Sequence, residues 1–307
     1  MLNGILNVYK EPGFTSNDVV AKLRGILHQK KIGHAGTLDP AAQGVLPILL
    51  GCATRLSGYV MDHDKTYRAV LLLGVVTDTQ DMTGTVLSRC MNELPAEAAL
   101  REAALSFIGT CEQLPPMYSA KQVNGKRLYE LARQGREVER KRVPVTIKDL
   151  QIERIELPEM TFSVSCSKGT YIRTLCHDIG QKLGCGGCMK QLTRTSCGGF
   201  EAEDAVTLGE IEALTAKGRI QDYVIPCEEL FPDCLKVRMV SEAAQKKLLN
   251  GNALTLHELS LPPEGAGELI RMYDRDGSFL AVYRFEKEKS RYVPFRMLIT
   301  KQTAGCV

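Results

Sequence analysis

The stretch from residue 160 to residue 184 constrains the fold most strongly, because its hydrophobic period changes once and abruptly. Every second residue from 160 to 166 is apolar, which is the pattern of a β-strand with one buried face. After Lys168-Gly169-Thr170 the apolar residues recur at helical spacing from 172 to 183, and Gly184 follows as a helix stop. The sequence therefore predicts a strand and an amphipathic helix joined by a short turn, in a chain that mixes α and β structure.

The same two periods recur along the rest of the chain. Strands are predicted at 45–50, 67–76, 85–90, 143–155, 268–273 and 278–285, and helices at 16–27, 96–108 and 241–249, with another after the capping box of Thr207 and Glu210. The strands at 67–76 and 85–90 are expected to be joined by a turn at 81–84. Residues 114–142 break this rhythm and are predicted to project as an insertion. We expect an α+β domain over residues 1–233, with a central, largely antiparallel mixed sheet. A small β-rich domain is expected over residues 234–307.

The composition is that of a soluble globular protein. Of the 307 residues, 44% are hydrophobic and 24% charged, and no apolar run reaches the roughly 18 residues that could cross a membrane. The first residues lack the basic and apolar regions of a signal peptide, so we expect a cytoplasmic protein without a membrane partner. The eleven cysteines show no framework spacing and are expected to be reduced. We expect a monomer with no obligate protein partner.

One segment carries most of the positive charge. The chain has a net charge of only +3, yet residues 121–148 hold nine lysines and arginines against three glutamates. Such a concentrated basic segment is typical of a protein that binds an anionic partner. A solvated surface loop has the same composition, so charge alone supports both interpretations.

The loop at residues 33–40 has the composition of a rigid site. Its glycines at 33 and 36 permit sharp backbone geometry, and Pro40 keeps Asp39 out of the helical region. A loop of this kind can hold a carboxylate and the imidazole of His34 beside a cleft. An ordinary proline turn that begins with aspartate is the alternative, and it is a common arrangement.

A wider motif, GHAGTLDPAAQGVLP at 33–47, resembles the catalytic motif of TruB-type pseudouridine synthases. Further blocks match this family in the expected order, namely GILNVYKEPGFTS at 4–16, KTY at 65–67, LPPMYSAK at 114–121, SKGTYIRTL at 167–175, and Leu192 with Arg194-Thr195. The resemblance runs from residue 4 to about residue 226, and ordered blocks are far more specific than one short motif. A small departure is found at 121–123, at the end of the LPPMYSAK block, where the residues are shifted slightly from the most usual sequence of the family.

The resemblance implies both a site and a substrate. Asp39 matches the essential aspartate, Tyr67 the tyrosine that stacks on the target base, and Tyr171 and Arg173 a second tyrosine and an arginine of the active site. Leu192 matches the segment that lines the uracil pocket. The basic insertion resembles a thumb loop that clamps RNA, with candidate contacts at Lys121, Lys126, Arg127, Arg133, Arg136, Arg140 and Arg142. The implied partner is the T arm of tRNA, the implied target is uridine 55, and the tail resembles a PUA-like domain.

Physical chemistry supports the same residue types. Making the C-linked isomer of uridine needs no redox change, phosphate energy or group donor, and the sequence holds no nucleotide-binding motif or paired metal spacing, so no cofactor is expected. Asp39 can act as nucleophile or proton acceptor, and an adjacent Arg173 would keep it ionised. A base inside a folded RNA arm must be flipped out, and stacking on Tyr67 and Tyr171 can offset that cost. His34 could fill the gap that the base leaves.

Several alternatives stay open at this point. Tyr67 can be a half-buried strand residue, Arg173 a solvated charge in a first helical turn, and Lys10 a solvated lysine. The pair Cys185 and Cys188 has the spacing of a zinc or redox site, but a single pair is a weak signal. The competing function is an RNA-binding protein that folds tRNA without chemistry.

Overall fold

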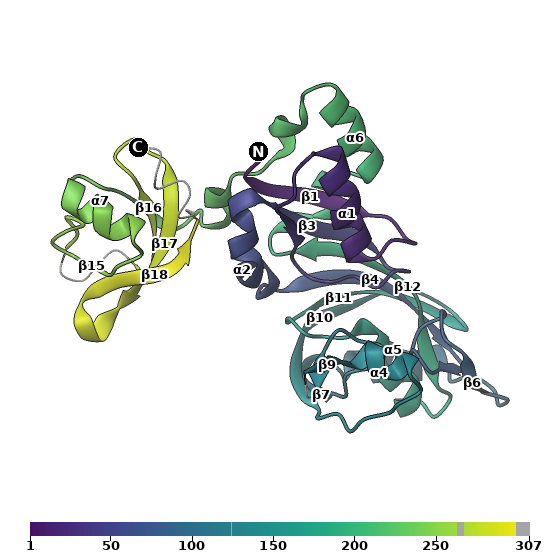
Figure 1. Cartoon of the computed structure of the whole chain (residues 1–307). Coiled ribbons are helices and arrows are strands. Elements are labelled where there is room, and N and C mark those ends of the chain that lie inside the picture. Colours follow the sequence, from purple (N-terminus) through teal and green to yellow (C-terminus); the bar gives the residue numbers. More distant parts are fainter. Residues whose placement is uncertain (124, 263–266, 299–307) are drawn as a thin grey trace.

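The computed structural model describes residues 1–123, 125–262 and 267–298, which form two large sheets with helices packed against them and two small two-stranded sheets (Figure 1). The larger sheet consists of β1 (Gly4–Lys10), β2 (Ile32–His34), β3 (Gln43–Leu50), β4 (Lys65–Leu73), β7 (Gly109–Gln113), β10 (Val143–Glu156), β11 (Glu159–Cys166), β12 (Gly187–Cys197) and β13 (Phe200–Glu201). Its main path is β1-β3-β12-β4-β11-β10-β7, with β2 beside β3 and β13 beside β12. Among the described strands of this sheet, β3 and β12 are the one parallel pair, so the expected α+β class with a largely antiparallel mixed sheet is confirmed.

Helices cover two separate areas of this sheet. Near β1 and β3 lie α1 (Ser16–Ile26) and α6 (Leu208–Ala216), and each begins with a capping box, formed by Thr15 with Asp18 and by Thr207 with Glu210. Around β12, β4 and β10 lie α5 (Ile172–Lys182) and α3 (Glu97–Leu105). Each area has its own continuous apolar core, so a different set of helices packs against each half of the sheet.

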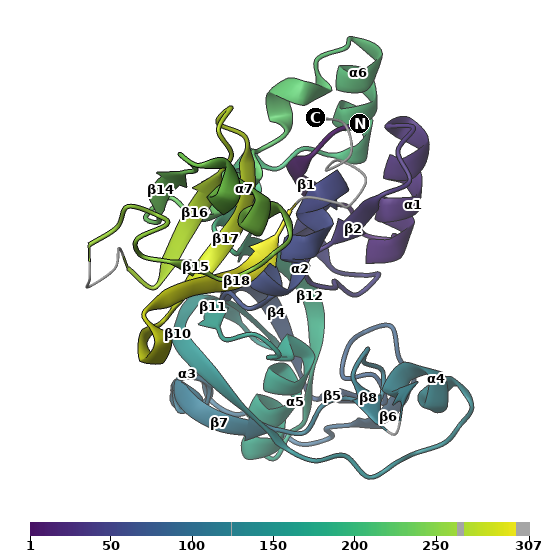
Figure 2. The same cartoon turned by 60° about the vertical axis from the view of Figure 1, so that its left-hand side comes forward.

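Short elements complete the larger part. They are η1 (Gly51–Leu56), α2 (Ser57–Met61), β5 (Val75–Thr77), β6 (Val86–Arg89), β8 (Gln122–Val123), β9 (Lys126–Arg127), α4 (Leu128–Arg133), η2 (Ala202–Asp204), η3 (Ile220–Tyr223) and η4 (Cys227–Leu230). The predicted insertion contains β8, β9 and α4, and Figure 2 shows β8 and α4 projecting to one side of the large sheet. No helix within the described ranges is long and apolar enough to cross a membrane.

A second, five-stranded sheet follows the large one. Its members are β14 (Leu235–Arg238), β15 (Leu254–Thr255), β16 (Leu269–Tyr273), β17 (Phe279–Glu286) and β18 (Arg291–Met297), together with α7 (Glu242–Leu249) and η5 (Lys287–Lys289). The aromatic ring of Tyr59 bridges the two parts, with its centroid 4.5 Å from Phe231 and 6.1 Å from Phe295. The sheet begins two residues after the boundary expected at 233. That residues 234–307 form a PUA-like domain remains a prediction, and part of this tail lies outside the described residues.

Most predicted elements are confirmed, but one pairing is wrong. Residues 67–76 do not form a single strand that a turn joins to 85–90. Gly74, with φ of +79°, interrupts the strand at this point. The first portion is β4, which pairs with β11 and β12, and only β5 pairs with β6. The sequence analysis also missed β12, whose alternation is interrupted by two register shifts against β4.

Candidate active site

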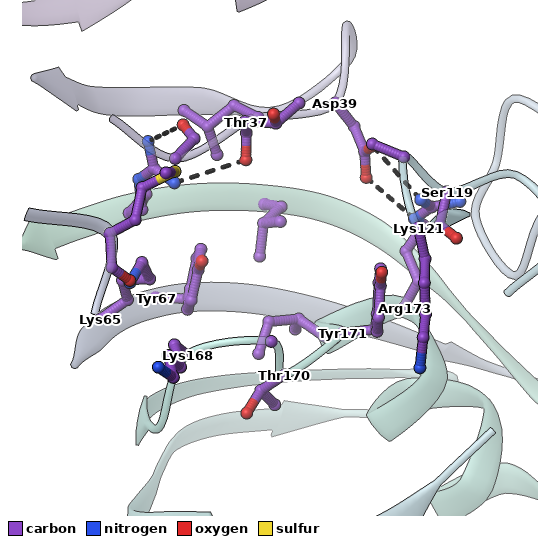
Figure 3. Close-up of a pocket in the computed structure, with 18 residues that line it drawn as sticks. Thr37, Asp39, Lys65, Tyr67, Ser119, Lys121, Lys168, Thr170, Tyr171 and Arg173 are labelled. Atoms are coloured by element: carbon purple, nitrogen blue, oxygen red, sulfur yellow. Dashed lines mark hydrogen bonds and ion pairs between the residues drawn. The ribbon is translucent and has the colours of Figure 1, made fainter. Parts of the chain in front are cut away.

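A cavity of about 440 Å³ lies where the loop after β2, the start of α5 and the strands β4 and β12 meet (Figure 3). Five of the residues predicted from the family resemblance to act in the site line it, namely Asp39, Tyr67, Tyr171, Arg173 and Leu192. They come from four separate parts of the chain, so the fold brings together what the sequence keeps far apart. Lys121, predicted as a thumb residue, lines the same cavity.

Arg173 is the centre of the polar contacts in this cavity. Its Nε lies 2.9 Å from Asp39 Oδ2, and its second terminal nitrogen donates to Asp39 Oδ1 at 3.2 Å, so the guanidinium grips the carboxylate with two nitrogens (Figure 3). The same side chain donates to the carbonyls of Thr79 and Tyr118 at 3.0 and 2.8 Å. Only 5% of it is exposed. The alternative of a solvated helix charge is therefore wrong.

Asp39 remains reachable from the cavity, since 37% of its side chain is exposed. Burial raises its pKa above the ordinary aspartate value, the Arg173 guanidinium opposes that rise, and the neighbouring carboxylate of Asp81 adds to it. A carboxylate in this position has one face fixed by an arginine and the other open to a ligand. It can act as a nucleophile or as a base.

Asp81 is a member of the site that the sequence analysis did not single out. Its Oδ2 lies 3.6 Å from Arg173, while its Oδ1 accepts from Thr79 Oγ1 at 2.8 Å and from the backbone nitrogen of Thr83 at 2.9 Å. Arg173 thus lies between two carboxylates. In the sequence, residues 81–84 have the composition of an ordinary turn, which hides this role.

A second buried arginine fixes the loop that carries Asp39. Arg194, on β12, is 1% exposed and donates to the carbonyls of Val45 at 2.7 Å and Gly36 at 2.9 Å. Gly36 has φ of +93°, and a Cβ there would lie 3.2 Å from the guanidinium. Glycine is therefore required at this point both by the backbone and by the close approach of Arg194.

Lys10 holds the other end of the same loop. Its ammonium donates to the carbonyls of Glu11, Phe14 and Pro40 at 3.0, 2.8 and 3.2 Å, and the residue is fully buried. Burial lowers the pKa of Lys10 to about 8. The alternative of a solvated lysine is wrong, because this side chain joins the end of β1 to the residue that follows Asp39.

The two tyrosines are held differently. Tyr67, on β4, is 7% exposed, and burial raises its pKa to about 12. It is a buried strand residue, as one alternative expected, and it also lines the cavity. Tyr171 precedes α5, and its backbone is clamped by Gln113, whose side chain accepts from Tyr171 N at 2.9 Å and donates to its carbonyl at 3.2 Å. The phenol rings thus have fixed places along the cavity.

His34 lies on β2, outside the lining of the cavity. Burial lowers its pKa, and the positive charge of Arg194 adds to the shift. Its predicted contact with a base or with the gap in a stack stays a prediction. Cys185 and Cys188 are buried, and Cys188 Sγ approaches Met82 Sδ at 3.6 Å. Among the residues that the structure describes, no group of three or more His, Cys, Asp or Glu could hold a metal ion.

The basic residues of the insertion separate into two kinds. Lys126, Arg127, Arg133, Arg136 and Arg142 are exposed. Arg140 is only 16% exposed and donates to the carbonyl of Pro115 at 3.0 Å, so it ties the segment to itself. Its predicted contact with RNA is less favoured by this geometry than those of its exposed neighbours.

The fold and the cavity together define an enzyme class. A mixed sheet carries one accessible carboxylate, an arginine that grips it, and tyrosines suited to a planar ring. Such a site serves nucleophilic or acid–base chemistry on a base or another flat substrate.

Relatives identify the class more closely. Residues 24–172 match the family described as TruB family pseudouridylate synthase (N terminal domain), and residues 173–232 match the tRNA pseudouridylate synthase B C-terminal domain. Proteins named tRNA pseudouridine synthase B from Alkaliphilus oremlandii and Lachnoclostridium phytofermentans are 45% and 47% identical. These matches cover 94% and 97% of this chain and all of each relative. A solved structure titled "Crystal Structure of a Cbf5-Nop10-Gar1 Complex" is similar over 97% of this chain and 86% of its own, with TM-score 0.72 and 25% identity.

The chain belongs to the TruB family of pseudouridylate synthases. It is therefore an isomerase, as the motifs indicated.

Proposed function

We propose that this enzyme converts uridine 55 in the T arm of tRNA to pseudouridine, with Asp39 as the essential carboxylate. The observation that carries the proposal is the two-nitrogen grip of Arg173 on Asp39 at the wall of a cavity that Tyr67, Tyr171 and Leu192 also line. The names of the relatives, tRNA pseudouridine synthase B, support the choice of tRNA.

The reaction moves one bond and leaves the composition of the nucleotide unchanged. The bond between C1′ and N1 of uridine breaks, the base turns within the cavity, a bond forms between C1′ and C5, and the proton of C5 is replaced by one on N1. Asp39 serves this sequence either by attacking C1′ or by removing a proton, and both roles need the ionised carboxylate. Arg173 favours that form, because it places a positive charge against both oxygens.

The tyrosines and the insertion would bind the RNA in two ways. Stacking of the flipped base on an aromatic ring contributes about 1–3 kcal/mol, which is comparable to the cost of flipping. The exposed cations of residues 126–142 would contact phosphates, since exposed arginine and lysine side chains can follow a flexible backbone. Chemistry and grip would thus come from different parts of the chain.

The test is to incubate the protein with an unmodified tRNA transcript and to map pseudouridine by carbodiimide labelling and primer extension. We expect one modified site, at position 55, and none in a transcript with cytidine at that position. A protein that only folds tRNA would bind the transcript and leave every uridine unchanged. Modification elsewhere in the tRNA, with position 55 intact, would contradict the proposed target.

A further inference from the structure

Residues 200–233 are as acidic as the insertion is basic. They hold nine aspartates and glutamates against two basic residues, a net charge of −7. Such a surface repels RNA phosphates, so the proposed reaction gives it no role. It includes η2, α6, η3 and η4, and it lies next to β1, the edge strand of the large sheet (Figure 1).

A cavity of about 350 Å³ opens within this acidic region. Two backbone hydrogen bonds to β1 bound this cavity. Ile5 N donates to Ile225 O at 2.8 Å, and Tyr9 N donates to Val206 O at 2.8 Å. Asn7 lies between these hydrogen bonds and lines the cavity. The gap between two backbone contacts therefore leaves a polar side chain at the base of a hollow.

Asn7 has an unused acceptor. The residue is 4% exposed, and its Nδ2 donates to Glu201 O at 2.8 Å. Its Oδ1 is buried and accepts no hydrogen bond from any part of the chain that the structure describes. A buried acceptor without a donor destabilises the folded chain, so a ligand that brings an N–H donor to this oxygen would recover that cost.

The rest of the lining specifies the charge and shape of such a ligand. Asp204, Asp222 and Glu229 supply carboxylates. Within the described ranges Asp204 and Glu229 form no ion pair, and Asp222 pairs only with Arg219 at 3.1 Å, a contact exposed to solvent on both sides. Apolar surface comes from Val206, Val224, Ile225 and Pro226.

We propose that this cavity binds an aliphatic polyamine. An ammonium group supplies the N–H donor that Asn7 Oδ1 lacks, further ammonium groups meet the carboxylates, and the methylene chain between them covers the apolar lining. The cavity shares no lining residue with the one that holds Asp39. It is therefore a second site on the enzyme, separate from the proposed RNA-modifying site.

The experiment is titration calorimetry of the full chain with spermidine at low salt. We expect saturable binding with one spermidine per chain. The double variant Asp204→Asn/Glu229→Gln should bind at least about tenfold more weakly, because two charge-assisted hydrogen bonds to ammonium groups are lost. The matched control, Glu203→Gln/Glu212→Gln, removes the same charge from the same acidic segment but does not line the cavity, and should change affinity less than about twofold.

A third variant tests the buried oxygen itself. Asn7→Leu keeps a similar volume and removes the acceptor, and it should weaken spermidine binding while thermal melting shows a folded protein. Equal losses in the two double variants would mean a diffuse acidic surface and would overturn the proposal, as would the absence of saturable binding. Tighter binding of arginine amide than of spermidine would overturn the assignment to a polyamine and indicate a guanidinium ligand.

Discussion

The active cavity and the insertion both rely on arginine, but in opposite surroundings. Arg173 is 5% exposed and fixed by two carboxylates and two carbonyls, whereas Arg133 and Arg136 are exposed. A buried cation with several partners has one position and can hold a reacting group. An exposed cation keeps its freedom and attracts RNA at a distance, in a way that salt weakens. We therefore propose that the two regions serve different steps, chemistry in the cavity and RNA binding in the insertion.

Among the residues that support Asp39, the largest effect is expected when the two-nitrogen contact of Arg173 is removed. Arg173→Met should lower the single-turnover rate by about 10²–10³-fold, as is usual when one group that stabilises charge in an active site is lost. It should also move the acidic limb of the pH–rate profile to higher pH. The sign follows because Arg173 lowers the pKa of Asp39, so without it the ionised form appears only at higher pH.

At saturating tRNA the Arg173→Met variant should have a lower single-turnover rate, and its affinity for tRNA should stay unchanged. A variant with normal rate and normal pH profile would show that Arg173 has only a structural place in the core.

The next effect concerns the insertion. Replacing Lys126, Arg133 and Arg136 with Gln should flatten the slope of log affinity against log salt by about 0.7–0.9 for each lost phosphate contact. Three contacts would change the slope by roughly 2–3, while the rate at saturation stays near that of the unchanged protein. Filter binding at several salt concentrations measures the slope.

The control for this variant removes the same charge elsewhere. Lys22, Lys30 and Lys217 are exposed and lie outside both the insertion and the cavity, and their replacement with Gln should leave the slope almost unchanged. The same loss in both variants would mean that RNA responds to net charge alone, and the insertion would lose its proposed role.

A smaller effect should come from Asp81. The carboxylate of Asp81 lies 3.6 Å from Arg173, and its negative charge raises the pKa of Asp39. Asp81→Asn removes that charge and should therefore lower the pKa of Asp39. The acidic limb of the pH–rate profile should therefore move to lower pH, opposite to the shift with Arg173→Met. We expect the rate at neutral pH to fall by about tenfold, equivalent to ~1.4 kcal/mol, because Arg173 loses one of its anchors. A shift to higher pH would contradict this arrangement of charges.

The sequence predicted the residues that line the cavity better than the residues that hold them in place. Asp39, Tyr67, Tyr171, Arg173 and Leu192 fall in motif blocks, and the structure gathers them around one cavity. Motif resemblance is local, so it can name residues that touch a substrate without showing what holds them. The supports are fixed by contacts between distant segments, which no period or spacing reveals.

Arg194 and Gln113 illustrate that limit. Arg194 falls in a family block, but the block does not reveal its hydrogen bonds to the carbonyls of Val45 and Gly36, which lie 149 and 158 residues away in the chain. Gln113 is 1% exposed and clamps the backbone of Tyr171, 58 residues away. A polar residue looks solvated in a sequence unless its partners are known, since burial of such a group depends on the whole fold. The fold class could be predicted because it follows from local periods, whereas the break at Gly74 that separates β4 from β5 could not.

Asp39→Asn tests the division between chemistry and grip most directly. This variant keeps the size of the side chain and removes its charge. Single-turnover conversion and filter binding should be measured with the same tRNA transcript, with thermal melting to confirm folding. We predict no pseudouridine above background and a Kd within a few-fold of the unchanged protein, because the exposed cations of the insertion remain. Measurable conversion by this variant, or a loss of binding as large as the loss of rate, would contradict the account.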